Sequence, residues 1–484
     1  MQVDTLEQVA FEVLHLIRSL KNRLAPINRI PPEVLTLIPD FWDTRDRDQD
    51  VIALSHVCRA WREAFTSYSS LWTDLDCVDA EKTRVYLKRS GSSPINLWID
   101  VEDGPLPHGP LLQLLPHVVG RLKSLSIKVT PDDLQDITTH LSRPAPLLEH
   151  LLIDGGCEYE TGRNPVLTTT LFDGDLSSLR FLHLQSVRTK LLWRNMANLT
   201  SFTLAHLLPA DVSLRQLLDF FESAPRLRDI ILFRTTPTSG AQNGRLVSLA
   251  CLKNMEIIGD EPSSLLLDHL VIPVGAELTT QIPFQLPLVG THLPRSLDSL
   301  KNLSNFTEIS IRLTEYTSRI GFTGPNGKVS IIPMARWPGN IAQIVLESLT
   351  RFDTSKTERL EILCIDPPPR HTACRALRPL KNLRSLTISR PTSHDAFISA
   401  LNPGLSPSDV LVCSKLEELV LTFRPDDDCD FDIETVIAMT AARASRGKKL
   451  KSVVIVNRDK LVQVEERELR KHVSCVVYGG QRRK

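Results

Sequence analysis

Apolar residues recur along most of this chain in the order L-x-x-L-x-L, with other aliphatic residues or phenylalanine in place of some leucines. The alternation in the second half of the pattern predicts a strand with one buried face, and the first leucine adds a further inward side chain. Twelve copies occur, beginning at Leu122, Leu148, Leu179, Leu199, Leu227, Leu252, Leu267, Phe306, Leu360, Leu383, Leu416 and Leu450.

Segments with helical spacing separate several copies, for example "SLRQLLDFFESAP" from Ser213. One such unit cannot bury its apolar face alone, whereas a stack of units forms a continuous core. We therefore predict an α/β fold in which an irregular leucine-rich-repeat solenoid, curved like a horseshoe, occupies residues 74–460. The intervals between copies range from 15 to 54 residues, and the asparagine or cysteine expected three places after each pattern is absent. An ordinary leucine-rich α/β domain is the alternative.

Two segments interrupt the repeats. The longest interval contains "SRIGFTGPNGKVSIIP", whose "PNGK" turn between alternating apolar residues predicts an inserted β-hairpin. The segment "DPPPRH", residues 366–371, looks most like a linker because of its three prolines. Since copies of the pattern lie on both sides of it, we expect a loop within one continuous array.

The two ends of the chain differ from the repeats. Residues 1–27 predict an amphipathic helix, whose apolar stripe is formed by Leu6, Ala10, Val13, Ile17, Leu20 and Leu24. This stripe spans fewer than three heptads, which is short for an independent coiled coil. We expect it to pack against the segment that follows or the first repeats, and self-association is the alternative. Residues 461–484 are expected to form a charged C-terminal tail.

Residues 28–73 form a further candidate domain, predicted to be small and all-helical. Pro31 and Pro32 can open a helix because its first turn needs no amide donors. Later, Val57, Trp61 and Phe65 recur every four residues and would form one stripe on a helix. About 45 residues are too few to bury all this apolar surface. Much of the stripe should therefore meet another chain or the next domain.

The order of three blocks, "IPPEVLTLI", "LSHVCRAWREAF" and "SSLW", resembles the F-box, which docks on a Skp-type adaptor of cullin–RING ubiquitin ligases. The usual form of this family is L-P-x-E-L-L-x-x-I, then V-C-R-x-W, then L-W. Here Ile30 replaces the usual first leucine, and "DTRDRDQD" lengthens the first loop. Together with "WTDLD" and the leucine-rich remainder, the arrangement is similar to the expanded F-box families of mushroom-forming fungi.

This resemblance implies a substrate-recognition subunit of an SCF-type (Skp–cullin–F-box) ubiquitin ligase, with the repeats binding a target protein that the sequence does not identify. The residues implied in adaptor binding are Ile30, Pro31, Glu33, Val34, Leu35, Ile38, Leu54, Val57, Cys58, Trp61, Leu71 and Trp72. Two alternatives need no ligase: a repeat-containing interaction scaffold, or a helical cap on the array. An enzyme with a hidden site is a third class that no motif supports.

Composition and motifs restrict the function further. Lys plus Arg and Asp plus Glu both number 57, so charge gives no case for nucleic acid or an anionic membrane as partner. The nine scattered cysteines and the lack of a signal-peptide pattern predict free thiols in the cytoplasm or nucleus. "GFTGPNGK" lacks the glycine and hydroxyl of a phosphate loop, and "DDDCDFDIE" lacks key calcium-loop residues. We expect no catalytic residues, metal or cofactor.

Overall fold

The computed structural model describes the chain as two compact units, Met1–Leu182 and His183–Lys484. The boundary lies inside residues 74–460, which we expected to form one domain. The description covers all residues except 1, 42–46, 77–78, 101–107, 157–163, 168–170, 189–195, 208–210, 236, 238–243, 260–262, 283–299, 301–303, 315–317, 334–348, 350–351, 365–367, 391–395, 406–410, 424–430, 432, 458–460 and 480–484.

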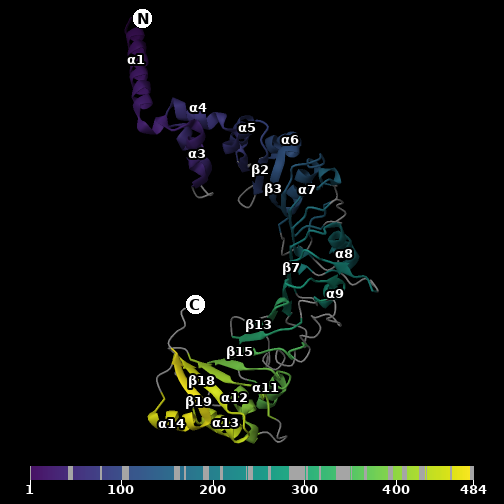
Figure 1. Ribbon diagram of the computed structural model, residues 1–484. Coiled ribbons are helices and arrows are strands. Elements are labelled where there is room, and N and C mark those ends of the chain that lie inside the picture. Colours follow the sequence, from purple (N-terminus) through teal and green to yellow (C-terminus); the bar gives the residue numbers. More distant parts are fainter. Residues whose placement is uncertain are drawn as a thin grey trace. The chain divides into compact units, whose positions relative to one another are not determined.

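The first unit begins with helices alone (Figure 1). They are α1 (Gln2–Leu24), η1 (Pro26–Arg29), α2 (Pro32–Leu35), η2 (Ile38–Phe41), α3 (Arg47–Ser55), α4 (Arg59–Ser67) and η3 (Ser69–Trp72). Pro32 begins α2, as expected. The apolar stripe of α1 is exposed, and Leu24 at its end is 72% exposed. The expected packing of this stripe on the following segment or the repeats is therefore absent from the described residues.

Parallel strands follow in the same unit. They are β1 (Asp74–Asp76), β2 (Ile95–Asp100), β3 (Leu122–Lys128) and β4 (His150–Asp154), each paired with the next. The helices between them are α5 (Ala80–Arg89), α6 (His108–Val118), η4 (Val119–Arg121) and α7 (Pro131–Thr139). After β4 come η5 (Leu171–Gly174) and β5 (Phe181–Gln185), and the boundary between the units falls within β5. Strand β2 has no L-x-x-L-x-L pattern, but its inward residues Ile95, Leu97 and Ile99 alternate as a strand requires.

The second unit opens with further parallel strands. Strands β6 (Ser201–Leu207), β7 (Asp229–Thr235), β9 (Asn254–Ile258) and β11 (Glu277–Ile282) pair in that order, with α8 (Leu214–Ser223) following β6. The copy predicted at Leu267 does not join this sheet. Leu267 ends α9 (Ser264–Leu267), and β10 (Leu270–Val271) pairs with β8 (Val247–Ser248) in a separate two-stranded sheet. In the main sheet, β11 takes the place expected for the Leu267 copy, although β11 has no L-x-x-L-x-L pattern.

The predicted hairpin is confirmed, but it is part of the sheet. Strands β13 (Ser318–Gly324) and β14 (Gly327–Pro333) are antiparallel, and β13 also pairs antiparallel with β12 (Glu308–Leu313). Strand β14 pairs parallel with β11, and β12 pairs parallel with β15 (Arg359–Cys364). The spatial order is therefore β11-β14-β13-β12-β15. A side chain at Gly324 would lie 2.5 Å from the Asn305 carbonyl oxygen, so this turn requires glycine.

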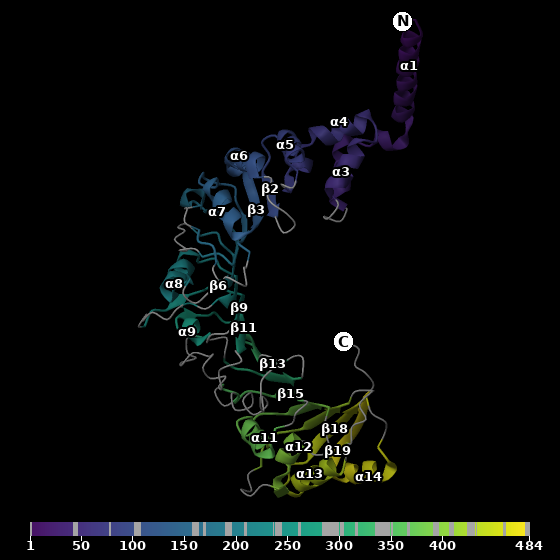
Figure 2. The ribbon, with the colours of Figure 1, turned by 180° about the vertical axis from the view of Figure 1, so that it is seen from behind.

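The rest of the second unit alternates strands and helices. Strands β15, β16 (Ser385–Ser389), β17 (Glu418–Thr422), β18 (Leu450–Val456) and β19 (Val473–Gly479) are parallel neighbours. Helices α11 (Arg370–Leu377), α12 (Ala396–Leu401), α13 (Glu434–Ser445) and α14 (Gln463–His472) lie side by side in the same order, with η10 (Pro403–Leu405) after α12 (Figures 1 and 2).

Two expectations about this region meet different outcomes. The segment 366–371 lies between the paired strands β15 and β16, so it does not separate domains, although its first residues are outside the description. Residues 461–484 were expected to be a charged tail, yet they contain α14 and β19. The sheet continues to Gly479 because the alternating apolar residues of β19 pair with β18.

Neighbouring copies are joined by a repeated main-chain contact. The amides of Arg384 and Ser385 donate to the Glu358 carbonyl at 2.8 and 3.0 Å, and those of Glu417 and Glu418 donate to the Arg384 carbonyl at 2.8 and 2.9 Å. In each case the acceptor is the second residue of one copy, and the donors are the second and third residues of the next. The same doubly accepting carbonyl occurs at Glu149, Thr200, Arg228, Thr307 and Glu417. Main-chain atoms thus join copies that lack the expected asparagine.

This contact also corrects the register of one copy. The copy predicted from Leu360 begins three residues earlier, at Thr357, because Glu358 occupies the second position of the pattern. Thr357 is buried where other copies have leucine, and its hydroxyl donates to the Phe306 carbonyl at 3.3 Å. The threonine in the first position concealed the true start of this copy from a search for leucine.

A buried arginine joins α13 to the turn before β17. Arg443 has no exposed surface, and its two terminal nitrogens donate to the carbonyls of Val412 and Cys413 at 2.9 and 2.7 Å. Burial lowers the pKa of Arg443 and raises the pKa of the adjacent Cys413 thiol to about 12, so that thiol is neutral. The guanidinium is held by carbonyl oxygens and not by a thiolate.

We expect Arg443→Ala to lower the free energy of unfolding of the second unit by about 2–5 kcal/mol, because it removes the buried hydrogen bonds to the Val412 and Cys413 carbonyls and opens a cavity. Urea-dependent pulse proteolysis of the full chain measures the change. Lys449→Ala, at an exposed position after the same helix, is the control and should change it by less than about 0.5 kcal/mol. Equal stabilities of the two variants would contradict this role for Arg443.

Candidate functional site

Trp72 forms the centre of the N-terminal helical segment. Its ring is fully buried, and its indole nitrogen donates to the Phe65 carbonyl at 2.8 Å. The ring packs edge-on against Tyr86 of α5, with 4.8 Å between centroids, and the Arg89 guanidinium lies 4.2 Å from the ring centroid. Trp72 therefore joins η3 to α5, so the apolar stripe is covered partly by the next element of the same chain.

Trp61 of α4 holds η1 against this helix. Its indole nitrogen donates to Oδ1 of Asn28 at 2.5 Å, and its ring stacks on Phe65 at 5.9 Å. The Asn28 amide nitrogen donates in turn to the Asn22 carbonyl at 2.5 Å. Asn28 thus connects the end of α1, the 3-10 helix η1 and helix α4 through one side chain.

The twelve residues implied in adaptor binding differ in their exposure. Leu35, Trp61, Leu71 and Trp72 are buried, and they hold the segment together rather than presenting a surface. Ile30, Ile38, Leu54 and Cys58 are half-buried, whereas Pro31, Glu33, Val34 and Val57 are exposed. Only the last two groups have surface that a partner can contact without rearrangement.

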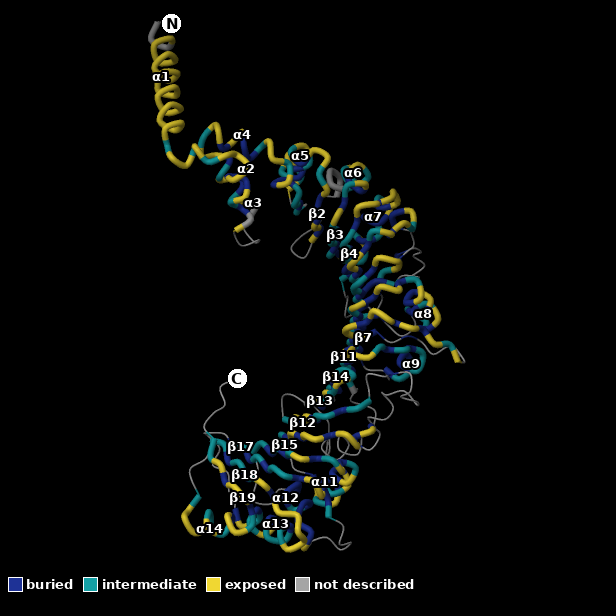
Figure 3. The backbone as a smooth tube through the Cα atoms, in the orientation of Figure 1, coloured by how far each residue is buried: buried dark blue, intermediate teal, exposed yellow. Residues whose placement is uncertain are grey.

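The structure adds apolar residues that the sequence analysis missed. Phe41 is 86% exposed, and Ile27, Leu37 and Ile52 are also exposed, as are Val34 and Val57 (Figure 3 shows the exposure along the chain). Exposed large apolar side chains gathered in one small segment are typical of an interaction surface. Val34, Leu37 and Phe41 follow helical spacing, and this signal could have identified them from the sequence.

Comparison with known proteins identifies a family for the N-terminal helical segment. Residues 27–78 match the family model of F-box-like domains. The match runs from η1 to the residues after β1, and it includes both buried tryptophans. A search of curated proteins finds no match to the chain. The F-box-like domain is thus identified for this segment, and the remaining residues are interpreted from their structure.

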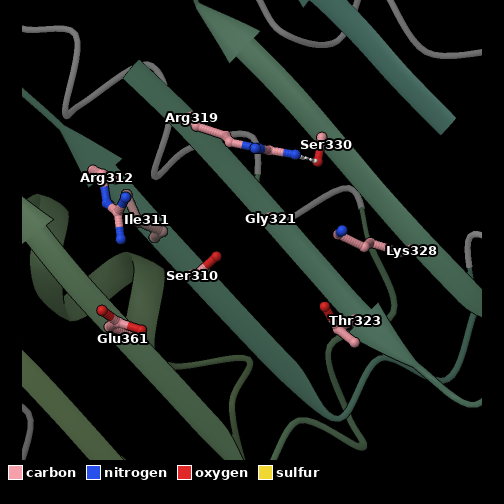
Figure 4. Close-up of a pocket in the computed structure, with 9 residues that line it drawn as sticks. All are labelled: Ser310, Ile311, Arg312, Arg319, Gly321, Thr323, Lys328, Ser330 and Glu361. Atoms are coloured by element: carbon pink, nitrogen blue, oxygen red, sulfur yellow. Dashed lines mark hydrogen bonds between the residues drawn. The ribbon is translucent and has the colours of Figure 1, made fainter. Parts of the chain in front are cut away.

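A second candidate site is a hollow on the sheet of the second unit. Its volume is about 460 Å³, and the residues that line it come from β12, β13, β14 and β15 (Figure 4). They are Ser310, Ile311, Arg312, Arg319, Gly321, Thr323, Lys328, Ser330 and Glu361. Three cationic side chains and one carboxylate thus surround a floor of hydroxyl groups and one glycine.

Neither a cluster of metal-ligating side chains nor a membrane-spanning helix is found among the described residues. They contain no group of three or more His, Cys, Asp or Glu side chains placed to hold a metal ion. No helix in the described part of the chain has both the length and the apolar character needed to cross a membrane. The structure describes six cysteines, and none of them is in a disulfide bond: Cys58, Cys251, Cys364, Cys374, Cys413 and Cys475.

We expect Trp72→Ala to destabilise the F-box-like domain by about 3–5 kcal/mol, because it removes a fully buried aromatic ring. Hydrogen–deuterium exchange of the α4 and α5 amides should accelerate at least about 100-fold. Trp98→Ala on β2 is the matched control, since that ring is 43% exposed, and it should leave α4 unaffected. Unchanged exchange in α4 and α5 of the Trp72 variant would refute the central position assigned to this ring.

Proposed function

We propose that the chain is a substrate-recognition subunit of an SCF-type ubiquitin ligase. The observation that carries the proposal is the F-box-like match at residues 27–78, which coincides with the segment of exposed apolar side chains. The F-box-like domain would dock on a Skp-type adaptor, which connects to a cullin–RING ligase. The leucine-rich strands and helices that follow would bind the target protein.

Adaptor docking would use the exposed part of the domain. Val34, Phe41 and Val57 offer apolar surface that a partner can remove from water. Exposed Glu33 directly precedes Val34 in the chain, and exposed Pro31 lies three residues before it. The buried residues Trp61 and Trp72 support this surface from within. Burial of a few apolar anchors contributes most of the binding energy in typical interfaces.

The chain would contribute proximity and not chemistry. Holding a target near a ubiquitin-charged enzyme raises the effective concentration of the reacting groups, and this alone accelerates transfer. We assign no catalytic residue and no cofactor to this chain. A ligase of this kind would act in the cytoplasm or nucleus, where thiols such as those of Cys251 and Cys475 stay reduced.

We also propose that the parallel strands form leucine-rich repeats. Support comes from the repeated carbonyl contact between copies and from the buried first residue of each copy, such as Leu383 or Leu416. Each strand leaves one face outward, which gives a broad surface for a protein target. A scaffold that uses this surface without a ligase is the alternative, and adaptor binding distinguishes the two.

We expect the double variant Val34→Glu, Phe41→Glu to bind the Skp-type adaptor at least about 30-fold more weakly, because two exposed anchors become charged. Biolayer interferometry with the purified adaptor of the source organism measures the affinity. Val274→Glu, an exposed valine of the second unit, is the matched control and should bind normally. Circular dichroism checks that all variants fold. If the double variant keeps full affinity, or the unaltered chain does not bind the adaptor, the proposal fails.

A further inference from the structure

The floor of the hollow is made by one row of small residues across three strands. Ser330, Gly321 and Ser310 lie directly opposite one another on β14, β13 and β12. A side chain at Gly321 would place its Cβ 2.6 Å from the Ser310 hydroxyl oxygen. The depth of the hollow therefore depends on glycine at this position, with a hydroxyl group on each side.

Positive charge borders the floor on both sides. Arg312 and Arg319 are opposite each other on one side, and Lys328 and Thr323 are opposite each other on the other. Like charges directly opposite on paired strands destabilise a sheet. An anion bound beside either arginine would offset this repulsion, and guanidinium groups suit phosphate and carboxylate oxygens especially well.

The existing contacts leave room for such a ligand. Arg319 donates from Nε and Nη2 to the Ser330 hydroxyl at 3.2 and 2.7 Å, which directs its guanidinium toward β14 (Figure 4). Lys328 Nζ lies 3.6 Å from Glu277 Oε2 at the opposite border. Glu361 is opposite Ser310 on β15 and places a carboxylate at one end of the hollow. A ligand with an anionic group and a neighbouring cation fits this order of charges.

Apolar residues continue the same row of the sheet. From Glu361 the opposite positions are Thr387, then Val420, Val454 and Val477, all at least partly exposed. Three strand steps separate Ser310 on β12 from Val420 on β17, which is about 14 Å at the usual strand spacing. An extended peptide covers that distance in about four residues.

We propose that this face binds an extended peptide that crosses the strands, with a phosphate or carboxylate group in the hollow and an aliphatic side chain about four residues away on Val420 and Val454. The proposal deepens the proposed function by naming the class of segment that the target would present. Only the identification of this peptide as part of a ubiquitination target rests on the proposed function. The binding site itself does not depend on an adaptor.

Fluorescence anisotropy of the full chain with three labelled peptides tests the site. The peptides are identical, with leucine four residues after a central position that carries phosphoserine, glutamate or serine. The phosphoserine or glutamate peptide should bind at least about 10-fold more tightly than the serine peptide, and the preferred one identifies the source of the anion. Equal binding of all three peptides, or no binding, would overturn the proposal.

Three variants and a control test where on the sheet the peptide binds. Arg312→Gln should weaken the anionic peptides at least 10-fold, and Glu361→Gln should strengthen their binding 2- to 5-fold because it removes an opposing charge. Gly321→Ala should weaken binding with no change in charge, since it fills the floor. Arg215→Gln on α8, where the side chain is 75% exposed, is the control and should have no effect. An Arg312 variant that binds like this control would place the peptide elsewhere, and adaptor affinity measured on the same proteins tests the ligase function separately.

The exposed stripe of α1 carries a second, independent inference. Its helix is 23 residues long, or about 34 Å, and the exposed Leu6, Val13 and Leu20 recur at seven-residue intervals. Glu7 and Lys21 hold the same position of the heptad two repeats apart, with Leu14 midway between them. Acidic residues lie in the first half of the helix and basic residues in the second.

These charges distinguish the two ways in which two copies can pair. In an antiparallel pair centred on Leu14, Glu7 of each copy faces Lys21 of the other, and the apolar stripes meet. In a parallel pair, the acidic halves lie together and so do the basic halves. We infer that α1 joins two copies of this chain through an antiparallel helix pair.

Sedimentation equilibrium of the full chain between 1 and 100 µM tests this pairing. The unaltered chain should form dimers, whereas Lys21→Glu or Glu7→Lys should weaken the dimer at least 5-fold, and the double swap should restore it. A parallel pair would not respond to the swap in this way. A monomer at 100 µM, or single variants that dimerise normally, would overturn the inference.

Discussion

The sheet depends on one main-chain contact, the carbonyl of the second residue in each copy that accepts two amides from the next copy. Since the acceptor is a peptide oxygen, the side chain at that position is free to vary. Glutamate, arginine and threonine all occupy it, at Glu358, Arg384 and Thr307. The contact needs only a buried residue just before it, such as Leu383, to keep the chain close to its neighbour. This explains how copies at irregular intervals still align.

Sequence analysis found the elements whose apolar residues alternate beside a leucine, and the hairpin at "PNGK". It missed β11 and β19, where buried Thr280 and Val473 lie opposite Ile257 and Leu450 of the neighbouring copies. It also misplaced the start of one copy, because Thr357 donates its buried hydroxyl to the Phe306 carbonyl of the neighbouring copy and so can replace leucine. A search for leucine detects the commonest way to fill a buried position, whereas the backbone requires only that the position be filled.

The F-box-like domain shows a different limit of such reasoning. The family resemblance grouped Trp61, Trp72, Val34 and Val57 as adaptor-binding residues, although the first two are buried and the others exposed. Helical spacing likewise placed Val57 and Trp61 on one stripe. Periodicity states which residues share a face, but not which neighbour covers it. In this chain α5 contributes Tyr86 and covers Trp72, so the interior of the F-box-like domain includes a residue beyond the matched range 27–78. The apolar side chains that stay exposed on this domain are fewer and include Val34 and Phe41.

The reversed order of β12 and β14 has a consequence for synthesis on the ribosome. Strand β11 ends at Ile282, but its neighbour in the sheet, β14, is made only with residues Gly327–Pro333. Until then the edge of β11 is open to pairing with any other strand. The three strands β12, β13 and β14 are close in sequence and can form first as a local unit. This unit must then add to β11 on one side and receive β15 on the other, so the array cannot grow by simple addition of one copy after another.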